Sequence, residues 1–273
     1  NGETGKHQGV LQTICSTRRE KCMLEYWDVI WILVKKDFKI RYRNSALGFV
    51  WSLLNPLSIM AILTLVFSLL LRSGITNFPI FLLAALLPWR FFQIGTMQAT
   101  GSIAGNPSLV KKIYLPRYLL VLTNNLASFI SFVMEFVALI PIMIALGMTL
   151  TIHSLLLPAV MAIELVMVLG ISLGLAALNV FYRDFYQIWE IALQLGFFLC
   201  PVFYDPNIIP ERYRFYYSLN PMTRIIESTR SILFHNTTPT VLDLMIPLLL
   251  GLLLLAIGYM IFRRLEPRFA EET

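Results

Sequence analysis

Charged residues are scarce in this sequence and make up only 14% of its 273 residues. A soluble domain carries about 25% charged residues, so the shortage indicates that lipid surrounds much of the folded chain. Hydrophobic residues reach 57%, and no long polar stretch is left that could form a second domain. The composition therefore predicts a single, all-α integral membrane domain.

Patterns for catalysis and metal binding are also missing. The three cysteines form no C-x-x-C pair, and the three histidines stand far apart without an H-E-x-x-H motif. Residues Gly2 to Lys6 resemble a phosphate-binding loop, but their glycine spacing is short and no strand precedes them. We therefore predict no catalytic residue, no metal site, and no ATP or Mg²⁺ bound by this chain itself.

Six apolar segments could cross a bilayer, which requires about 20 residues in a helix. Asn55-Pro56 interrupts the first segment, Pro88-Trp89-Arg90 interrupts the second, and the fifth is short. Proline is tolerated within spans because neighbouring helices can satisfy the freed carbonyl groups. The predicted spans are Ala46–Leu71, Phe78–Ser102, Tyr118–Leu146, Leu155–Phe181, Ile188–Phe203 and Leu242–Phe262.

Basic residues lie mostly beside these apolar segments, which favours a role in membrane orientation over binding to nucleic acid. They are concentrated before the first span, after the second and fourth, and after the last. The positive-inside rule then places both termini in the cytoplasm and predicts a multi-pass protein of the plasma (inner) membrane. The residues that set this orientation include Lys35, Arg43, Lys111, Lys112, Arg117, Arg183, Arg263, Arg264 and Arg268.

Two amphipathic segments flank the spans. Residues 26–45 repeat apolar side chains at helical spacing opposite a basic face, which predicts a helix in the membrane interface. Residues 205–238 carry four arginines on the outer side, so we expect a re-entrant helical hairpin there. The predicted organisation is a polar tail at 1–25, the interface helix, a six-span domain at 46–263 and a cytoplasmic tail at 264–273.

Three charged residues, Arg90, Glu135 and Glu164, fall inside predicted spans. A charge in the bilayer is costly and usually faces protein or water. These side chains therefore either line a polar pathway or form a structural pair, such as Arg90 with one glutamate. Aromatic residues, at 13%, are similarly open to two interpretations, as membrane packing or as a surface on which sugar rings stack.

The run from Lys36 to Gly48, followed by Trp51 and Asn55-Pro56, resembles the opening of ABC-2-type exporter permeases, in particular the polysaccharide and teichoic-acid exporters. The resemblance covers nearly everything from Tyr26 onward. Further similar strings, in the same order, are Leu87-Pro88-Trp89, Asn106 to Arg117, Asn179 to Asp184, Pro201-Val202-Phe203-Tyr204 and Leu219-Asn220-Pro221-Met222.

This resemblance implies a homodimer whose subunits each dock on a cytoplasmic ATPase, so that two ATPase copies bind ATP and Mg²⁺. Spans one, two and five would line a conduit at the dimer seam. The candidate conduit residues are Trp51, Trp89, Arg90, Phe92, Phe197, Phe198 and Tyr204. The candidate ATPase-coupling residues are Asp37, Lys39, Arg41, Lys111, Lys112, Arg183 and Asp184.

The resulting hypothesis is a transport subunit, not an enzyme, that exports a lipid-linked O-antigen-type or teichoic-acid-type glycan. An exporter of a drug or small lipid on the same fold is an alternative. An integral membrane glycosyl- or acyltransferase is a third possibility, but it would need a polar catalytic cluster at one membrane face, and the sequence offers none.

Overall fold

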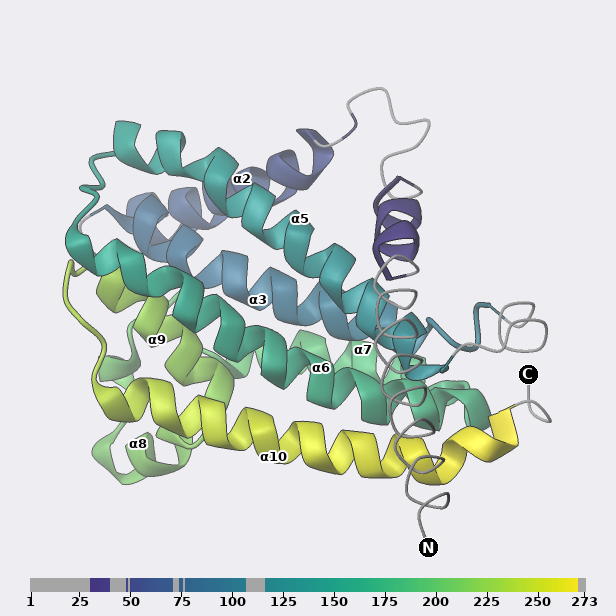
Figure 1. Cartoon of the computed structure of the whole chain (residues 1–273). Helices are drawn as coiled ribbons and strands as arrows, with labels where there is room; N and C mark the ends of the chain where they lie inside the picture. Colours follow the sequence, from purple (N-terminus) through teal and green to yellow (C-terminus); the bar gives the residue numbers. More distant parts are fainter. Residues whose placement is uncertain are drawn as a thin grey trace, which may run out of the picture.

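The computed structural model describes residues 30–39, 48, 50–70, 74–75, 77–106 and 116–269, and the regular structure among them is entirely helical (Figure 1). The predicted tail at 1–25 and the coupling candidates Arg41, Lys111 and Lys112 lie outside these residues. The elements, in order, are a helical segment at 30–39, α2 (Val50–Thr64), η1 (Leu65–Leu70), α3 (Phe78–Thr100), α5 (Tyr118–Ala145), η2 (Ile152–Leu156), α6 (Leu157–Phe181), α7 (Asp184–Leu199), η3 (Pro206–Ile208), α8 (Glu211–Ser218), α9 (Pro221–Leu233), α10 (Val241–Leu265) and η4 (Glu266–Arg268).

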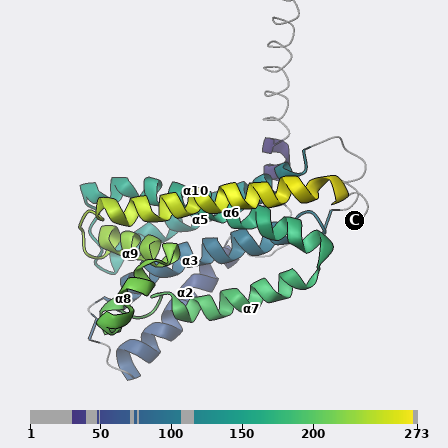
Figure 2. The same ribbon diagram turned by 90° about the horizontal axis from the view of Figure 1, so that it is seen from below.

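Five of these helices are long and apolar enough to cross a membrane: α2 with η1, α3, α5, α6 with η2, and α10 with η4. Helix α7 has 16 residues and would extend about 24 Å, less than the roughly 30 Å of a hydrocarbon core. It runs alongside the bundle on the side away from α5 and α10 (Figure 2). The described residues therefore give five spans, and the sixth stays a prediction.

The prolines within the first two spans do not break their helices. Pro56 lies inside α2 and Pro88 inside α3, and both helices continue through them. Both prolines are buried against neighbouring helices, which is where a missing backbone hydrogen bond is tolerated. The prediction that both spans tolerate their prolines is therefore confirmed.

Helix α3 is the centre of the bundle. Its most apolar stretch is 78% buried, whereas that of α2 is 6% buried and that of α10 is 17% buried. Helices α5, α6 and α9 pack on α3, and α2 and α7 contact it from further sides. Apolar helices with an exposed surface, such as α2 and α10, suit contact with lipid or with another subunit. Among the five spans, α3 alone has the burial of an internal helix.

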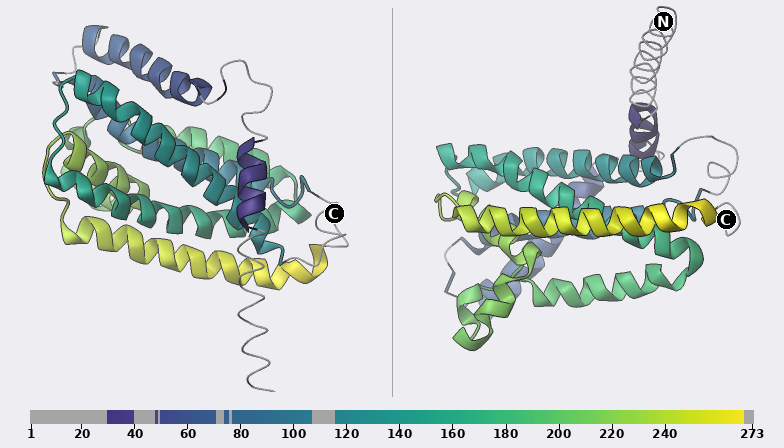
Figure 3. Two further views of the ribbon diagram at one scale, coloured as in Figure 1. Left: turned by 45° about the horizontal axis from the view of Figure 1, so that its top comes forward. Right: turned by 60° about the horizontal axis from the view of Figure 1, so that its bottom comes forward.

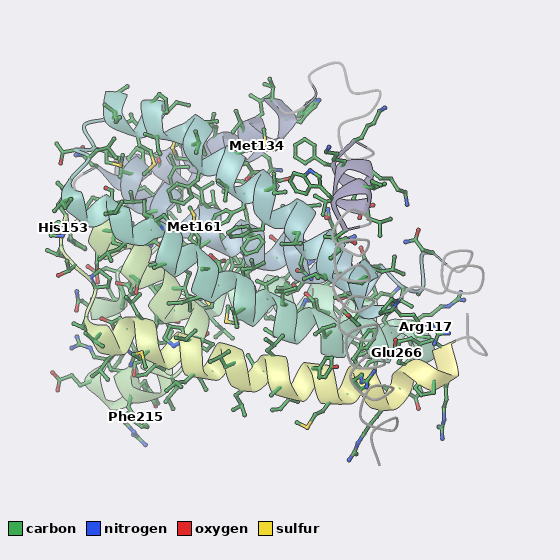
Figure 4. The ribbon with its side chains drawn as sticks, in the orientation of Figure 1. Arg117, Met134, His153, Met161, Phe215 and Glu266 are labelled. Carbon is green, nitrogen blue, oxygen red and sulfur yellow. The ribbon has the colours of Figure 1, made fainter. Side chains whose placement is uncertain are left out.

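The bundle has two distinct ends. Arg117, Glu266 and the segment at 30–39 lie at one end, while His153 and α8 lie at the other (Figure 4). The segment at 30–39 runs across the bundle direction instead of along it (Figure 3). At the same end Arg117 donates from its backbone N–H to Glu266 Oε1 at 3.3 Å, which ties the start of α5 to the end of α10.

Helices α6 and α10 approach so closely that their backbones touch. A Cβ atom added at Gly258 of α10 would lie 2.0 Å from the Gly170 carbonyl oxygen, and one added at Gly170 would lie 2.4 Å from the Leu255 nitrogen. Small residues allow such close contacts between membrane helices. Gly170-Ile171-Ser172-Leu173-Gly174 matches the G-x-S-x-G pattern in spacing, but it lies mid-helix in α6 and Ser172 donates to Asn125 at 3.3 Å. It is therefore a packing motif and not a nucleophile elbow, which needs a strand-to-helix turn.

We predict that Gly258→Ala separates α6 from α10 and lowers stability by about 1–3 kcal/mol, the usual cost of overpacking. Thermal unfolding of the detergent-purified protein measures the loss. Gly174→Ala is the matched control, because its new Cβ would meet Gly258 at an ordinary 3.7 Å. Equal melting temperatures for the two variants would contradict the close approach.

Candidate functional site

A cavity of about 540 Å³ opens between α2, α3 and α7, and we refer to it as the central groove. Its lining combines aromatic, amide and guanidinium groups with apolar side chains. The lining residues are Asn55 and Ile59 of α2, Leu86, Trp89, Arg90, Gln93, Ile94, Met97 and Gln98 of α3, and Phe197 of α7. Such a mixture of ring faces and neutral hydrogen-bonding groups suits a hydroxyl-rich ligand better than a purely apolar one.

Arg90 connects three helices beside the central groove. Its guanidinium donates to Asn55 Oδ1 of α2, and its Nε lies 3.7 Å from Glu135 Oε2 of α5. The side chains of Arg90 and Glu135 are only 12% and 7% exposed. The structural pairing that the sequence left open is therefore present, and Arg90 still lines the groove.

An aromatic cluster joins α7 to α3. The Trp89 ring centroid lies 5.6 Å from that of Phe92 and 6.0 Å from that of Phe197, and Phe92 lies 6.2 Å from Trp189. A Cβ atom at Gly196 would lie 2.9 Å from the Trp89 ring, so glycine is what allows α7 to cover this tryptophan. Trp89 and Phe92 are consequently buried, although Trp89 still lines the groove.

Two hydrogen bonds join the C-terminal half of α3 to α6 and α7. The indole Nε1 of Trp189 donates to Thr96 Oγ1 at 2.9 Å, and the Asn179 amide donates to the Thr100 carbonyl at 3.1 Å. Polar side chains between membrane helices are typically paired in this way. These two bonds hold the ends of α7 and α6 against α3.

Arg230 of α9 is fully buried and organises residues 201–233, which we refer to as the α8–α9 hairpin. Its guanidinium donates to the Val202 carbonyl at 2.7 Å and to the Phe81 carbonyl at 3.2 Å, and it pairs with Glu227 at 2.8 Å. It also lies 3.6 Å from the centroid of the Phe81 ring. A buried cation needs such complete pairing, so α9 is fixed to α3 and to the turn that follows α7.

Helix α8 is attached to this hairpin more loosely. The Tyr204 and Tyr217 hydroxyls share a hydrogen bond, and Arg214 donates to the Asn207 carbonyl at 3.4 Å. Burial and the bond to Tyr204 raise the pKa of the Tyr217 hydroxyl, so it stays neutral. On the other side of α9, Arg224 pairs with Asp243 at 2.7 Å, and Asp243 also caps α10 through Thr240.

Glu164 of α6 is the third charged residue within the predicted spans. It is 1% exposed, and neither carboxylate oxygen has a hydrogen-bond partner among the described residues. It does not line the central groove. Among the described residues no three His, Cys, Asp or Glu side chains gather as a metal site would require.

Comparison with known proteins decides the family. The model of the ABC-2 type transporter family matches residues 28–234, which is most of the chain. This chain belongs to the ABC-2 type transporter family. The match includes α2, α3 and α7 and the whole α8–α9 hairpin, so the central groove lies within the matched region.

Relatives of this ABC-2 transporter chain match it over nearly their entire length. The O-antigen export system permease protein RfbA of Klebsiella pneumoniae is 30% identical, covering 90% of this chain and 95% of its own. The protein of the same name from Myxococcus xanthus is 33% identical, with 91% and 96% covered. The polysialic acid transport protein KpsM of Escherichia coli is 22% identical, with 86% and 92% covered.

The structure places the predicted conduit residues in different surroundings. Trp89, Arg90 and Phe197 line the central groove, and Phe92 is buried behind Trp89. Trp51 and Phe198 are 59% and 65% exposed on α2 and α7. Tyr204 lies in the α8–α9 hairpin, where it also donates to the Phe198 carbonyl at 3.1 Å.

The predicted coupling residues that the structure describes lie at the end of the bundle that holds Arg117. Arg183 and Asp184 are exposed at the turn between α6 and α7, Lys39 is exposed, and Asp37 is half-buried. The groove residues Asn55, Gln93 and Gln98 were not among the sequence candidates. Helical spacing could have found Gln93, since it lies one turn after Trp89 and Arg90 on one face of α3.

In this ABC-2 transporter, Glu135→Gln should lower stability, because Arg90 would keep a buried charge without its carboxylate partner. Arg90→Gln should also destabilise the protein, whereas the double variant should recover part of the summed loss. We expect a coupling energy of about 0.5–3 kcal/mol from thermal unfolding of the four proteins. Strictly additive losses would show that the 3.7 Å pair contributes nothing.

Arg230→Lys should detach α9, since the guanidinium reaches two carbonyl groups and a carboxylate from three different nitrogens, whereas all donors of lysine lie on one nitrogen. The expected result is faster cleavage between residues 201 and 220 by protease added to the detergent-purified protein. Arg212→Lys is the control, because Arg212 is exposed and its guanidinium lies over the ring of Tyr213, its own neighbour in the chain. Unchanged cleavage in Arg230→Lys would contradict the anchoring role.

Proposed function

We propose that this chain is the membrane subunit of an ABC exporter that carries a lipid-linked polysaccharide across the plasma (inner) membrane. The observation that carries the proposal is the similarity, over at least 90% of the chain, to proteins named O-antigen export permeases. The polysialic acid transport protein, a more distant relative, supports the same substrate class. An O-antigen-type and a teichoic-acid-type glycan both fit this proposal.

The central groove supports a hydroxyl-rich polymer as the substrate. Its ring faces can contact the C–H faces of sugars, and Asn55, Gln93 and Gln98 can exchange hydrogen bonds with successive hydroxyl groups. Glu135 offsets much of the charge of Arg90. A groove with little net charge can hold a moving polymer without binding any one unit tightly.

Two copies of the chain would complete the passage. Helices α2 and α7 border the central groove and expose Val50, Trp51, Leu54, Ile188, Ile191, Leu195 and Phe198. Exposed apolar faces on both sides of a polar groove suit a homodimer seam, with the groove of each copy facing the other. In this arrangement Trp51 and Phe198, exposed in one subunit, would lie at the seam beside the conduit.

Six spans with both termini in the cytoplasm complete the proposed topology. Helix α7 and the residues up to Phe203 would be the fifth span, and α8 and α9 would form the re-entrant hairpin on the outer face. The basic residues at the opposite end, including Arg117, Arg183, Arg263 and Arg264, support a cytoplasmic location for that end. Anchored by Arg230, α9 would be the fixed part of the outer gate.

Energy would come from another chain. We place ATP and Mg²⁺ on a cytoplasmic ATPase subunit, two copies of which would dock on the dimer. Arg183 and Asp184 are exposed at the α6–α7 turn, where a docked subunit could move α7 directly. Asp37, Lys39, Arg41, Lys111 and Lys112 are the further candidates for this contact.

Deleting the gene tests the proposed function. In the deletion strain we expect the glycan to disappear from the cell surface while its lipid-linked form accumulates on the cytoplasmic side. In a separate experiment with the tagged chain, we expect a Walker A-containing ATPase to co-purify. Normal surface glycan, together with altered export of a drug or small lipid, would reject polysaccharide as the substrate.

Gln93→Leu should reduce glycan export several-fold without changing the amount of folded protein, because it removes a hydrogen-bonding group from the groove wall. Surface glycan per unit of transporter is the measurement. Gln187→Leu makes the same change on the exposed part of α7 outside the groove and should leave export unchanged. Equal export in both variants would contradict a role for the groove wall.

A further inference from the structure

A second groove, of about 520 Å³, lies on a different side of the molecule, between the segment at 30–39 and α5. Trp31, Val34 and Phe38 form one wall, and Ile130 and Met134 of α5 form the other. Apart from the side chains of Lys35 and Lys39, every residue in this lining is apolar or aromatic. Grooves of this size and character hold hydrocarbon chains or drug-sized ligands.

The walls of this groove are fixed by packing beside it. Ile30 and Val34 are 9% and 2% exposed, and they form one buried cluster with Leu119 and Ala127 of α5. The segment crosses the bundle direction, so it lies along the membrane surface when the spans are upright (Figure 3). The groove therefore runs from this surface towards the apolar middle of α5, where Met134 lies (Figure 4).

Two lysines stand at the polar side of the groove. Lys35 and Lys39 are exposed and four residues apart, so they project from one face of the helical segment. The Lys35 ammonium lies 5.7 Å from the centroid of the Trp31 ring, which is itself half-exposed. A tryptophan ring beside lysine ammonium groups is the usual arrangement at the level of lipid headgroups.

We propose that this groove binds one anionic phospholipid of the cytoplasmic leaflet, with an acyl chain between Trp31 and Met134 and the phosphate beside Lys35 and Lys39. Anionic lipids are enriched in that leaflet, and each basic residue near the surface favours them. The bound lipid would fill the gap between the interface segment and α5. It would thus act as part of the joint between them.

The location of the groove favours a bilayer lipid over the lipid carrier of the glycan. The segment at 30–39 lies on the α5 side of the bundle, whereas α7 and the central groove lie on the opposite side (Figures 2 and 3). A carrier that delivers its glycan to the central groove would have no reason to dock across the bundle. The inference requires only that this end of the bundle faces the cytoplasm, and it is independent of which substrate is exported.

Fluorescence quenching of Trp31 tests the site in the full-length protein, reconstituted in phosphatidylcholine vesicles. A small fraction of the lipid carries bromine on its acyl chains and has either a phosphatidylglycerol or a phosphatidylcholine headgroup. Trp31→Phe identifies the signal of this tryptophan among the five in the chain. We expect brominated phosphatidylglycerol to quench Trp31 at much lower fractions than brominated phosphatidylcholine.

Lys35→Gln and Lys39→Gln should each raise the fraction of phosphatidylglycerol needed for half-quenching about fivefold, and together about 25-fold. Lys36→Gln is the matched control, because Lys36 is equally exposed but does not line the groove. Ile130→Phe combined with Met134→Phe keeps both lysines and fills the acyl slot, so it should also remove the headgroup preference.

Four results would overturn the proposal. Equal quenching by the two headgroups would exclude an anionic site, and a Lys36→Gln effect as large as that of Lys39→Gln would leave only general surface attraction. Displacement of the brominated lipid by an equimolar polyprenyl phosphate would assign the groove to the glycan carrier instead. Because Lys39 is also a candidate ATPase contact, loss of ATPase co-purification in Lys39→Gln with unchanged quenching would likewise count against the lipid site.

Discussion

Arg90 is the charge on which the arrangement of the first three spans depends. An arginine in the middle of an apolar helix must be paired, because an isolated cation is costly within a membrane. Its bond to Asn55 and its pair with Glu135 hold α2 and α5 on two sides of α3. Helix α7 contacts α3 from a further side, where it covers Trp89 through Gly196. The central groove is the space that these constraints leave open, with Arg90 in its wall.

A second buried arginine has a comparable role at the end of the bundle that holds α8. Arg230 uses backbone carbonyl groups, one carboxylate and one ring face, so its position is fixed more completely than that of Arg90. Helix α9 is thereby joined to α3, while α8 keeps an exposed surface and few bonds. Within one fold, a part that stays in place is more stable than a part that moves. The proposed gate would open by displacement of α8 against a fixed α9.

Much of the fold could be predicted from the sequence, because span length and polarity are local properties. The apolar runs gave α3, α5, α6 and α10 nearly at their observed bounds. The prediction that the spans tolerate proline is confirmed, since a single missing hydrogen bond does not end a helix that its neighbours surround. The π-helical turn at Leu65–Leu70 left no signal, and the short α7 does not settle whether the sixth span exists.

The candidate site was harder to predict, because it depends on contacts between distant residues. Arg90 and Glu135 are 45 positions apart, and one sequence does not show which helix faces meet. Trp89 and Phe92 were chosen for their ring chemistry, yet the same chemistry buries them under α7. Arg230 looked like one of several outer basic residues, although it is fully buried. Composition identifies the residue types in a site, whereas burial and pairing follow from tertiary packing.

The central claim is that the groove between α2, α3 and α7 is the wall of the glycan passage. Photocrosslinking during ATP-driven export in membrane vesicles tests it most directly, with a benzophenone-bearing residue placed at position 197 in the groove or at position 249. Leu249 is 58% exposed on the surface of α10 and does not line the groove. The account predicts glycan adducts at position 197 that require ATP and none at position 249. Adducts at 249 alone, or at neither position during measurable export, would contradict it.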